Sequence, residues 1–269
     1  MTIPYCDTLI LSDLHLGSEM SRARDALRLL ERHYFERLIL LGDIFCDLNF
    51  GRLKKDHWRL LSHIRKLSNP KRGIEVVWVE GNHDHGLSLV MSHLVGIKVY
   101  QQYVWEYRGV RHLAVHGHQF DRFFTDNALL GSLASAGFQL LQKLDFGGQG
   151  LSKLVDRLDT RWRRHSPKVA AGAMAHARAH HAQRVFCGHT HQAMHLVEDG
   201  VEYFNTGCWI QAPATYITID EQGVQIHEYD QRSDDRYSGE ERGDSAAEAF
   251  ELPGAAGLFG DAAYEGVPG

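Results

Sequence analysis

Five short apolar runs in this chain are each followed by polar residues of the kinds that bind metal ions. The runs cover residues 8–11, 38–41, 75–80, 113–115 and 185–187, and their length and β-branched content predict buried strands. The polar residues that follow them are Asp13 and His15; Asp43 and Asp47; Asn82, His83 and Asp84; His116 and His118; and His189 and His191. Because loops at the carboxyl ends of strands form the binding crevice of an open α/β sheet, we expect these side chains to meet at one site.

The order of the predicted elements indicates the fold class. Apolar spacing predicts one helix from Ser21 through Tyr34 and a second over residues 56–67, ended by Asn69-Pro70. Strands that alternate with helices in this way favour parallel pairing. Beyond Gly96 the pattern changes to hairpins, which pair residues 99–107 with 110–116, 194–197 with 201–204, and 216–219 with 224–229. We therefore expect an α/β fold with two facing mixed β-sheets flanked by helices.

Charge divides the chain into a folded part and a tail. Residues 231–269 hold nine acids and three arginines, a net charge of −6, whereas the whole chain carries −5, so residues 1–230 sum to +1. We expect one domain over residues 1–230 and an acidic, flexible tail over residues 231–269, where no apolar periodicity remains. The nearly neutral folded part argues against a nucleic-acid partner, which would require a basic surface.

A long helical insert is predicted over about residues 121–182. Residues 128–144 are mostly apolar, Gly147-Gly148-Gln149-Gly150 breaks the pattern, and residues 151–164 again show helical spacing. These features fit either ordinary packing with a solvated face or a lid that covers a substrate and meets phosphate or an anionic membrane. The basic residues on one face of the second segment are Lys153, Arg157, Arg161 and Arg164.

The sequence predicts a cytoplasmic protein. Residues 1–11 lack the basic start of a signal peptide, and no run reaches the ~20 apolar residues that span a bilayer. The four cysteines show no Cys-x-x-Cys spacing and are expected to be reduced. Peripheral attachment to the inner membrane stays open.

The residue types in the five polar motifs suit a centre of two divalent metal ions. Two ions ~3.5–4 Å apart need a shared carboxylate and several nitrogen or oxygen ligands on each side, and Asp43 is the natural bridge. Asp13, His15 and one histidine of the last motif can hold one ion, while Asn82, His116 and the other histidine can hold the second. A mixed set of Asp, Asn and His without cysteine predicts manganese.

Each motif taken alone has a simpler explanation. Asp13 could cap a helix, Asp43 could belong to a turn, and His116 could be a core histidine with satisfied hydrogen bonds. Five motifs that each follow a strand and each supply a compatible ligand favour the metal centre over five unrelated explanations.

These motifs resemble those of the calcineurin-like metallophosphoesterase superfamily, over residues 8–230. The resemblance implies that one ion binds Asp13, His15, Asp43 and His191, and that the other binds Asp43, Asn82, His116 and His189. It also implies in-line attack of a bridging water or hydroxide on phosphorus, with His83 acting near the leaving group and Asp84 orienting it. The matching motifs are Asp13-x-His15, Gly42-Asp43-x-x-x-Asp47 (one residue longer than the superfamily's commonest spacing), Gly81-Asn82-His83-Asp84, His116-Gly117-His118 and Gly188-His189-x-His191.

Within the superfamily, the chain is similar to the UDP-2,3-diacylglucosamine pyrophosphohydrolases of lipid A biosynthesis. The similarity lies in the length, in the Leu-Ser-Asp-Leu-His-Leu-Gly of residues 11–17 and in the helical insert, which in that family is a lid over acyl chains. That family includes peripheral membrane proteins. This chain differs from that family at two positions near the substrate phosphate. His83 stands where the family typically has arginine, and His118 stands where it has aspartate.

Three functional hypotheses follow. The first is hydrolysis of a pyrophosphate-linked, lipidic nucleotide sugar to UMP and a sugar 1-phosphate lipid, with His118 and the basic residues of the insert binding the substrate. The second is a phosphodiesterase or phosphatase that acts on soluble nucleotides or other phosphoesters. The third is a non-catalytic scaffold, which the intact set of seven ligand positions disfavours.

Overall fold

The computed structural model describes residues 4–84, 86, 96–121 and 166–230. Residues Met1–Asp230 form one compact unit. Three regions singled out in the sequence lie outside the described residues. They are the apolar segment 128–144, the segment 151–164 with its four basic residues, and the acidic tail.

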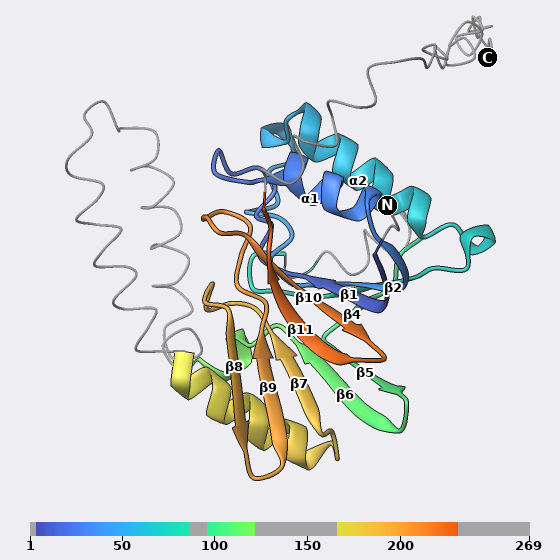
Figure 1. The fold of residues 1–269 in the computed structure, drawn as a ribbon. Helices are drawn as coiled ribbons and strands as arrows, with labels where there is room; N and C mark the ends of the chain where they lie inside the picture. Colours follow the sequence, from blue (N-terminus) through green and yellow to red (C-terminus); the bar gives the residue numbers. More distant parts are fainter. Residues whose placement is uncertain (1–3, 85, 87–95, 122–165, 231–269) are drawn as a thin grey trace, which may run out of the picture. The chain divides into compact units, whose positions relative to one another are not determined.

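The first sheet has six strands in the order β11-β10-β1-β2-β3-β4 (Figure 1). Its parallel strands are β1 (Tyr5–Leu11), β2 (Tyr34–Leu41), β3 (Glu75–Val79) and β4 (Val99–Tyr100). The hairpin of β10 (Thr215–Asp220) and β11 (Gly223–Glu228) extends the sheet antiparallel to β1. The helices α1 (Ala23–Glu31) and α2 (Lys55–Leu67) cover one face of this sheet.

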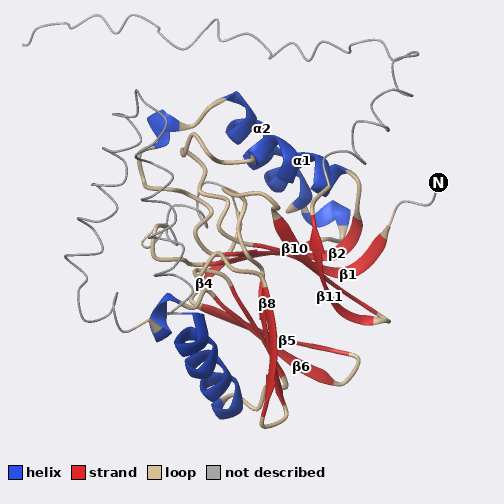
Figure 2. Ribbon diagram, turned by 60° about the vertical axis from the view of Figure 1, so that its left-hand side comes forward, coloured by secondary structure: helices blue, strands red, loops and turns tan. Residues whose placement is uncertain are grey.

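The second sheet has five strands in the order β5-β6-β7-β9-β8. Its three central strands are parallel and its two outer strands are antiparallel to their neighbours. A helix over residues 166–179 packs against this sheet (Figure 2). The strands are β5 (Gln102–Tyr107), β6 (Val110–Val115), β7 (Arg184–Cys187), β8 (Met194–Glu198) and β9 (Val201–Asn205).

Three apolar clusters hold these layers together, and β1 shows how alternation along a strand produces them. Leu9 and Leu11 pack in the cluster that joins the first sheet to α1 and α2, whereas Ile10 packs between the two sheets. A third cluster joins the second sheet to residues such as Ala170 and Ala173 of the helix over residues 166–179. The expected α/β fold with two facing mixed sheets flanked by helices is confirmed.

Two predicted elements differ in the structure. The first helix ends at Glu31, and Tyr34 instead begins β2, where it pairs with Tyr5 of β1. The single strand expected over residues 99–107 is two strands in different sheets, because β4 pairs with β3 and β5 pairs with β6. Periodicity does not reveal this change of sheet, since both short strands have the same extended pattern.

The loops that follow β1 and β2 are joined by backbone hydrogen bonds, and this places the first two motifs side by side. The amide of Asp13 donates to the carbonyl of Gly42 at 3.0 Å, and the amide of His15 donates to the carbonyl of Asp43 at 3.0 Å. The pairing continues in a short parallel bridge between Leu16 and Phe45.

Two further observations bear on the membrane and redox expectations. Within the described ranges, no helix has the length and apolarity needed to cross a bilayer. The four cysteines, all of which lie in those ranges, are free thiols.

Candidate metal centre

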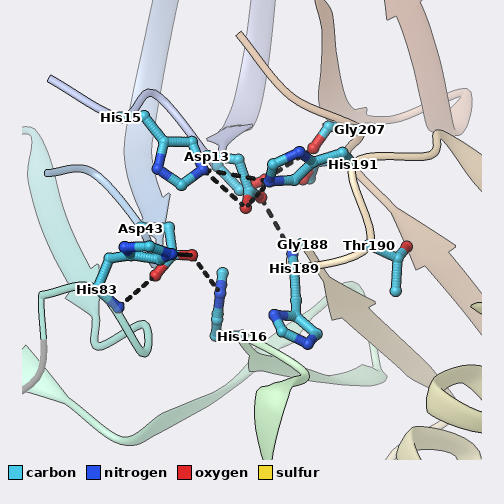
Figure 3. Close-up of polar contacts among 12 residues, drawn as sticks. Asp13, His15, Asp43, His83, His116, Gly188, His189, Thr190, His191 and Gly207 are labelled. Atoms are coloured by element: carbon cyan, nitrogen blue, oxygen red, sulfur yellow. Dashed lines mark hydrogen bonds and ion pairs between the residues drawn. The ribbon is translucent and has the colours of Figure 1, made fainter. Parts of the chain in front are cut away.

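The polar residues that follow β1, β2, β3, β6 and β7 converge on one buried site (Figure 3). Within it, two groups of three side chains offer ligand atoms within 4.8 Å of one another at opposite ends, and a third group of the same kind links them. The groups are Asp13, His15 and His191; Asp43, His116 and His189; and His15, Asp43 and His83.

The first group brings together one carboxylate and two imidazoles. The Nε2 atom of His191 lies 3.2 Å from Oδ1 of Asp13 and 3.2 Å from Nε2 of His15. The Nε2 atom of His15 lies 3.8 Å from the same Asp13 oxygen. Three potential ligand atoms that face one another at this spacing can surround a single ion.

Asp43 lies between this group and the next. Its Oδ2 is 3.3 Å from Nε2 of His116 and 3.9 Å from Nε2 of His83. It belongs to two of the three groups, which is the position expected of a carboxylate shared by two ions. Asn82 immediately precedes His83 in the chain, and the backbone amide of His83 donates to Oδ1 of Asp43 at 2.9 Å.

Five of the expected ligands share an unusual backbone conformation. Positive φ angles occur at Asp13 (52°), His15 (45°), Asp43 (51°), His189 (67°) and His191 (56°). For residues other than glycine this region is sparsely populated and costs of order 1 kcal/mol or more each, so it persists where the surroundings impose it. Strain of this kind, gathered at the loops after the strands, marks the site independently of its side chains.

Buried polar atoms without hydrogen bonds give a direct test of whether the site suits metal ions. Among the described residues, three buried atoms of the site have no hydrogen bond. They are Oδ1 of Asn82, and Oδ1 of Asp13 and Nε2 of His116, whose contacts are the ion pairs with His191 and Asp43 given above. Buried polar groups are normally satisfied; single exceptions also occur elsewhere in the described residues, as at Nε2 of His112, but three gathered in one site call for a shared partner such as an ion. These three atoms are of the types that coordinate divalent cations, so the residues fit the metals that the motifs imply.

The electrostatics of the ligand side chains fit the same purpose. Burial lowers the pKa of His15 to about 3, which keeps its imidazole neutral and able to coordinate. Burial also opposes charge on His116, but the Asp43 carboxylate outweighs it and raises the pKa of His116 to about 10. The reciprocal attraction of His116 overcomes burial and holds the pKa of Asp43 well below its usual value. A bound cation would take the place of the proton that His116 carries beside Asp43.

His83 and Asp84 are placed differently from the sequence-based expectation. The Nδ1 atom of His83 lies 2.8 Å from the carbonyl oxygen of Cys46. The Asp84 carboxylate instead accepts the amides of Gly81 at 2.6 Å and Ile44 at 3.0 Å. The expectation that Asp84 orients His83 is therefore wrong: a backbone carbonyl contacts that ring, and Asp84 ties together the loops after β2 and β3. Burial, and then repulsion from Asp43, raise the pKa of Asp84 to about 6.

The candidate substrate-binding residues divide into one that is described and four that are not. The ring of His118 lies 5.5 Å from that of His116 and 6.3 Å from that of His189, measured between centroids, so it borders the second group. Asp47, the last residue of the Asp43 motif, contacts the guanidinium of Arg52 and belongs to none of the three ligand groups. Lys153, Arg157, Arg161 and Arg164 lie outside the described residues.

Two supporting residues were missed in the sequence. The hydroxyl of Ser12 contacts both the Asp13 carboxylate and the hydroxyl of Thr206, and so connects β1 to the turn after β9. Asp121, which is 3% exposed, places Oδ2 3.4 Å from Nε2 of His189. The available signal for Asp121 was an acid three positions beyond His118, close enough in sequence to share its loop.

Three glycines in the motifs are required by close packing. A Cβ atom at Gly42 would lie 2.3 Å from the His116 ring, one at Gly81 2.2 Å from Oδ1 of Asp43, and one at Gly188 2.3 Å from Oδ2 of Asp13. The ligand side chains thus press against the backbone of neighbouring motifs, which explains why glycine precedes Asp43, Asn82 and His189 in the sequence.

Comparison with known proteins identifies the family. Residues 7–223 match the calcineurin-like phosphoesterase superfamily domain, and no curated protein matches the sequence. Solved structures share the fold at low identity. A conserved uncharacterized protein of Streptococcus pneumoniae, described as a predicted phosphoesterase, is 16% identical, with 84% of this chain and 93% of that chain covered and a TM-score of 0.40.

Two other structures are similar to the same extent. A novel archaeal phosphodiesterase is 14% identical, with 82% of this chain and 98% of that chain covered and a TM-score of 0.44. Vacuolar protein sorting 29 from Cryptosporidium parvum is 13% identical, with 82% and 96% covered and a TM-score of 0.41. Because the family match runs from β1 to the hairpin beyond the last motif, this chain belongs to the calcineurin-like phosphoesterase superfamily, whose members are metal-dependent phosphoester hydrolases.

Proposed function

We propose that this protein hydrolyses a phosphodiester or pyrophosphate bond at a centre of two divalent ions. The observation that carries the proposal is the position of Asp43, which belongs both to the group of His116 and His189 and to the linking group that contains His15. Asp13, His15 and His191 would hold one ion together with Asp43, and Asn82, His116 and His189 would hold the other. The ions, once bound, would supply Lewis acidity toward the phosphoryl oxygens and lower the pKa of a water nucleophile.

The side chain proposed to act on the leaving group is His83. Its Nδ1 faces the Cys46 carbonyl, so Nδ1 carries the hydrogen, and Nε2 is the nitrogen left to exchange a proton. Nε2 of His83 lies 3.9 Å from Oδ2 of Asp43, and the His83 side chain is 26% exposed. A partly exposed imidazole at the edge of a buried ligand cluster is placed to donate a proton to a departing oxygen.

We further propose that the two ions are manganese. The ligand set contains oxygen and imidazole nitrogen but no thiolate, which suits a borderline divalent cation. Removal of metal with a chelator should abolish activity, and manganese should restore it. Full activity in a metal-free preparation, confirmed by elemental analysis, would contradict the proposed centre.

As substrate we propose UDP-2,3-diacylglucosamine or a similar lipidic nucleotide sugar, cleaved to UMP and a sugar 1-phosphate lipid by an enzyme peripheral to the inner membrane. Two observations support an apolar substrate. The sequence inserts an apolar, basic-striped segment between the His116 and His189 motifs. In addition, Leu48 is 50% and Phe50 is 38% exposed in the loop that begins at Cys46, whose carbonyl contacts His83.

The experiment compares UDP-2,3-diacylglucosamine with bis(p-nitrophenyl) phosphate, each with manganese. The lipidic substrate should be turned over with the higher kcat/KM. Conversion of Lys153, Arg157, Arg161 and Arg164 to glutamine should raise KM for the acylated substrate and weaken liposome association, while hydrolysis of the chromogenic diester is unchanged. The matched control is Asp43→Ala, which should abolish hydrolysis of both substrates.

The alternative substrate class is soluble nucleotides or other phosphoesters. It is favoured by His83 and His118, which differ from the residues typical of the lipid A enzymes at the substrate phosphate. Turnover of the plain diester together with no turnover of the acylated substrate would establish the alternative. The intact ligand positions continue to argue against a non-catalytic scaffold.

A further inference from the structure

Asp121 contacts the imidazole of His189 although it belongs to none of the motifs. Its Oδ2 lies 3.4 Å from Nε2 of His189, and the two residues are 3% and 2% exposed. A carboxylate removed from water at this depth is unfavourable unless a partner compensates it. The contact with a histidine of the second ligand group therefore requires an explanation in terms of that group.

The position of Asp121 is fixed by the element before it. Asp121 follows the 3₁₀ helix His118–Phe120, and its backbone amide donates to the carbonyl of His118 at 3.2 Å. Phe120 packs against the helix over residues 166–179 so closely that a Cβ atom at Gly172 would lie 2.8 Å from Cβ of Phe120. The ring of Phe120 also lies 5.5 Å from that of His176. Asp121 therefore follows a segment, His118–Phe120, that packs against the second sheet and the helix over residues 166–179.

His189 is held at a second point through its own backbone. Its amide donates to Oδ2 of Asp13 at 3.1 Å, and its backbone has a positive φ of 67°. An imidazole whose Nε2 hydrogen is donated to a carboxylate keeps its lone pair on Nδ1. Nδ1 is then the nitrogen with which His189 can join Asp43 and His116 around an ion.

We propose that Asp121 is a positioning residue of the metal centre. It accepts the Nε2 hydrogen of His189, fixes the tautomer and orientation of that ring, and so presents Nδ1 to the ion shared with Asp43 and His116. Carboxylates that accept the second hydrogen of a metal-bound imidazole raise its basicity and its affinity for the metal. The inference rests on the two-ion centre proposed above.

His116 provides an internal comparison. Its Nδ1 lies 3.0 Å from the backbone carbonyl of Leu41, which leaves Nε2 for the same ion. Two imidazoles of one ligand group are therefore oriented by different partners, a backbone carbonyl for His116 and a side-chain carboxylate for His189. Only the second partner can be altered by substitution, which makes the role of Asp121 testable.

The test measures manganese binding to the metal-free full-length protein by equilibrium dialysis and elemental analysis. The parent protein should bind two ions per chain. In Asp121→Ala the affinity for one ion should fall by about 10- to 100-fold while the affinity for the other is retained. Asp121→Asn should lose less, because its amide oxygen can still accept the Nε2 hydrogen. Asp56→Asn, which alters a carboxylate on α2 that pairs with Arg24 and Arg59, is the matched control and should bind both ions as the parent does.

Three results would overturn the inference. Parental affinity for both ions in Asp121→Ala would show that the carboxylate does not position a ligand. An equal loss of affinity for both ions would show a general effect on the fold. If Asp121→Ala does not fold, Asp121→Asn, checked for native circular dichroism, supplies the comparison. A parent protein that binds no manganese would overturn the proposed two-ion centre itself. A parent that binds two ions, with an Asp121→Ala variant that binds both equally well, would overturn only the role of Asp121.

Discussion

The Nδ1 atom of His83 lies 2.8 Å from the carbonyl oxygen of Cys46, so a residue of the loop after β3 is oriented by the backbone of the loop after β2. A carbonyl can only accept, and this contact therefore fixes the hydrogen on Nδ1 and leaves Nε2 to face the ligand group of His15 and Asp43. The arrangement leaves two possibilities for Nε2, since it could exchange a proton with the substrate or coordinate an ion.

Substitution of His83 separates these possibilities. If the ring acts as an acid, His83→Ala should lower kcat by ~10²–10⁴-fold, the usual range for a lost acid–base group. Manganese content should stay at the parental level, because Asp43 and His15 still hold the ions. Steady-state kinetics and elemental analysis on the same preparation make the measurement. Loss of one bound ion in the variant would instead assign His83 as a ligand.

Gly81→Ala should displace Asp43 without any change of ligand identity. The new Cβ atom would lie 2.2 Å from both the amide nitrogen and Oδ1 of Asp43, and real contacts of this kind exceed 3.0 Å. The shared carboxylate must move, so we expect manganese affinity and kcat to fall by at least about 10-fold, since small misplacements of reacting groups are costly. Gly73→Ala is the control, because a Cβ atom there contacts nothing within 4 Å and only its φ of 68° is unfavourable. That variant should lose about 1 kcal/mol of stability and no metal.

Much of the site could be predicted because its expected ligands lie in short sequence motifs. Six of the seven expected ligands fall into the clustered groups, and Asn82 leaves a buried oxygen without a hydrogen bond beside them. Strand ends, residue types and spacing were sufficient, since parallel strands bring such ends to one edge of each sheet, and the ligand groups join the motifs of the two sheets. The fold class followed from the same alternation of strands and helices.

The parts that could not be predicted depend on contacts between distant segments. The partner of His83 is a backbone carbonyl, and backbone groups have no signature in a sequence. The change of sheet between β4 and β5 depends on which strand each one meets rather than on its own pattern. Asp121 was overlooked because an acid after a motif is common, and only its contact with Nε2 of His189 in the structure shows where its carboxylate is directed.

Asp84→Ala should destabilise the fold through two amides rather than through His83. The carboxylate accepts the buried amides of Gly81 and Ile44, and removing it leaves both donors without a partner. Each unsatisfied buried amide costs about 1–3 kcal/mol, so we expect the two together to lower the free energy of unfolding by about 2–6 kcal/mol. Urea unfolding of the metal-free protein measures it. Asp47→Ala, which breaks a partly exposed pair with Arg52, should cost about 1 kcal/mol or less. Equal losses in the two variants would contradict the role assigned to Asp84.

The last prediction concerns a buried histidine far from the motif carboxylates, His112 of β6. Its Nδ1 lies 2.9 Å from the carbonyl of Val110, and its Nε2 is buried without a hydrogen bond among the described residues. The imidazole packs beside the rings of Trp105 and Phe186. Burial, together with the nearby Arg184 guanidinium, lowers the pKa of His112 from 6.5 to about 4. The folded protein therefore binds fewer protons than the unfolded chain between these two values, and stability present above pH 6.5 is lost as the pH falls toward 4.

The linkage gives an expected size and a clean comparison. Between pH 7 and pH 5, His112 alone should remove up to about 2 kcal/mol from the free energy of unfolding of the parent. In His112→Gln, whose amide does not titrate, that contribution should vanish. The difference in the free energy of unfolding between parent and variant should therefore change by up to about 2 kcal/mol between pH 7 and pH 5. Urea unfolding at both pH values with excess chelator measures it, and the remaining histidines cancel in the comparison because both proteins carry them. A parent–variant difference that stays constant with pH would show that His112 is protonated as readily in the fold as in the unfolded chain, and would contradict the apolar environment assigned to it.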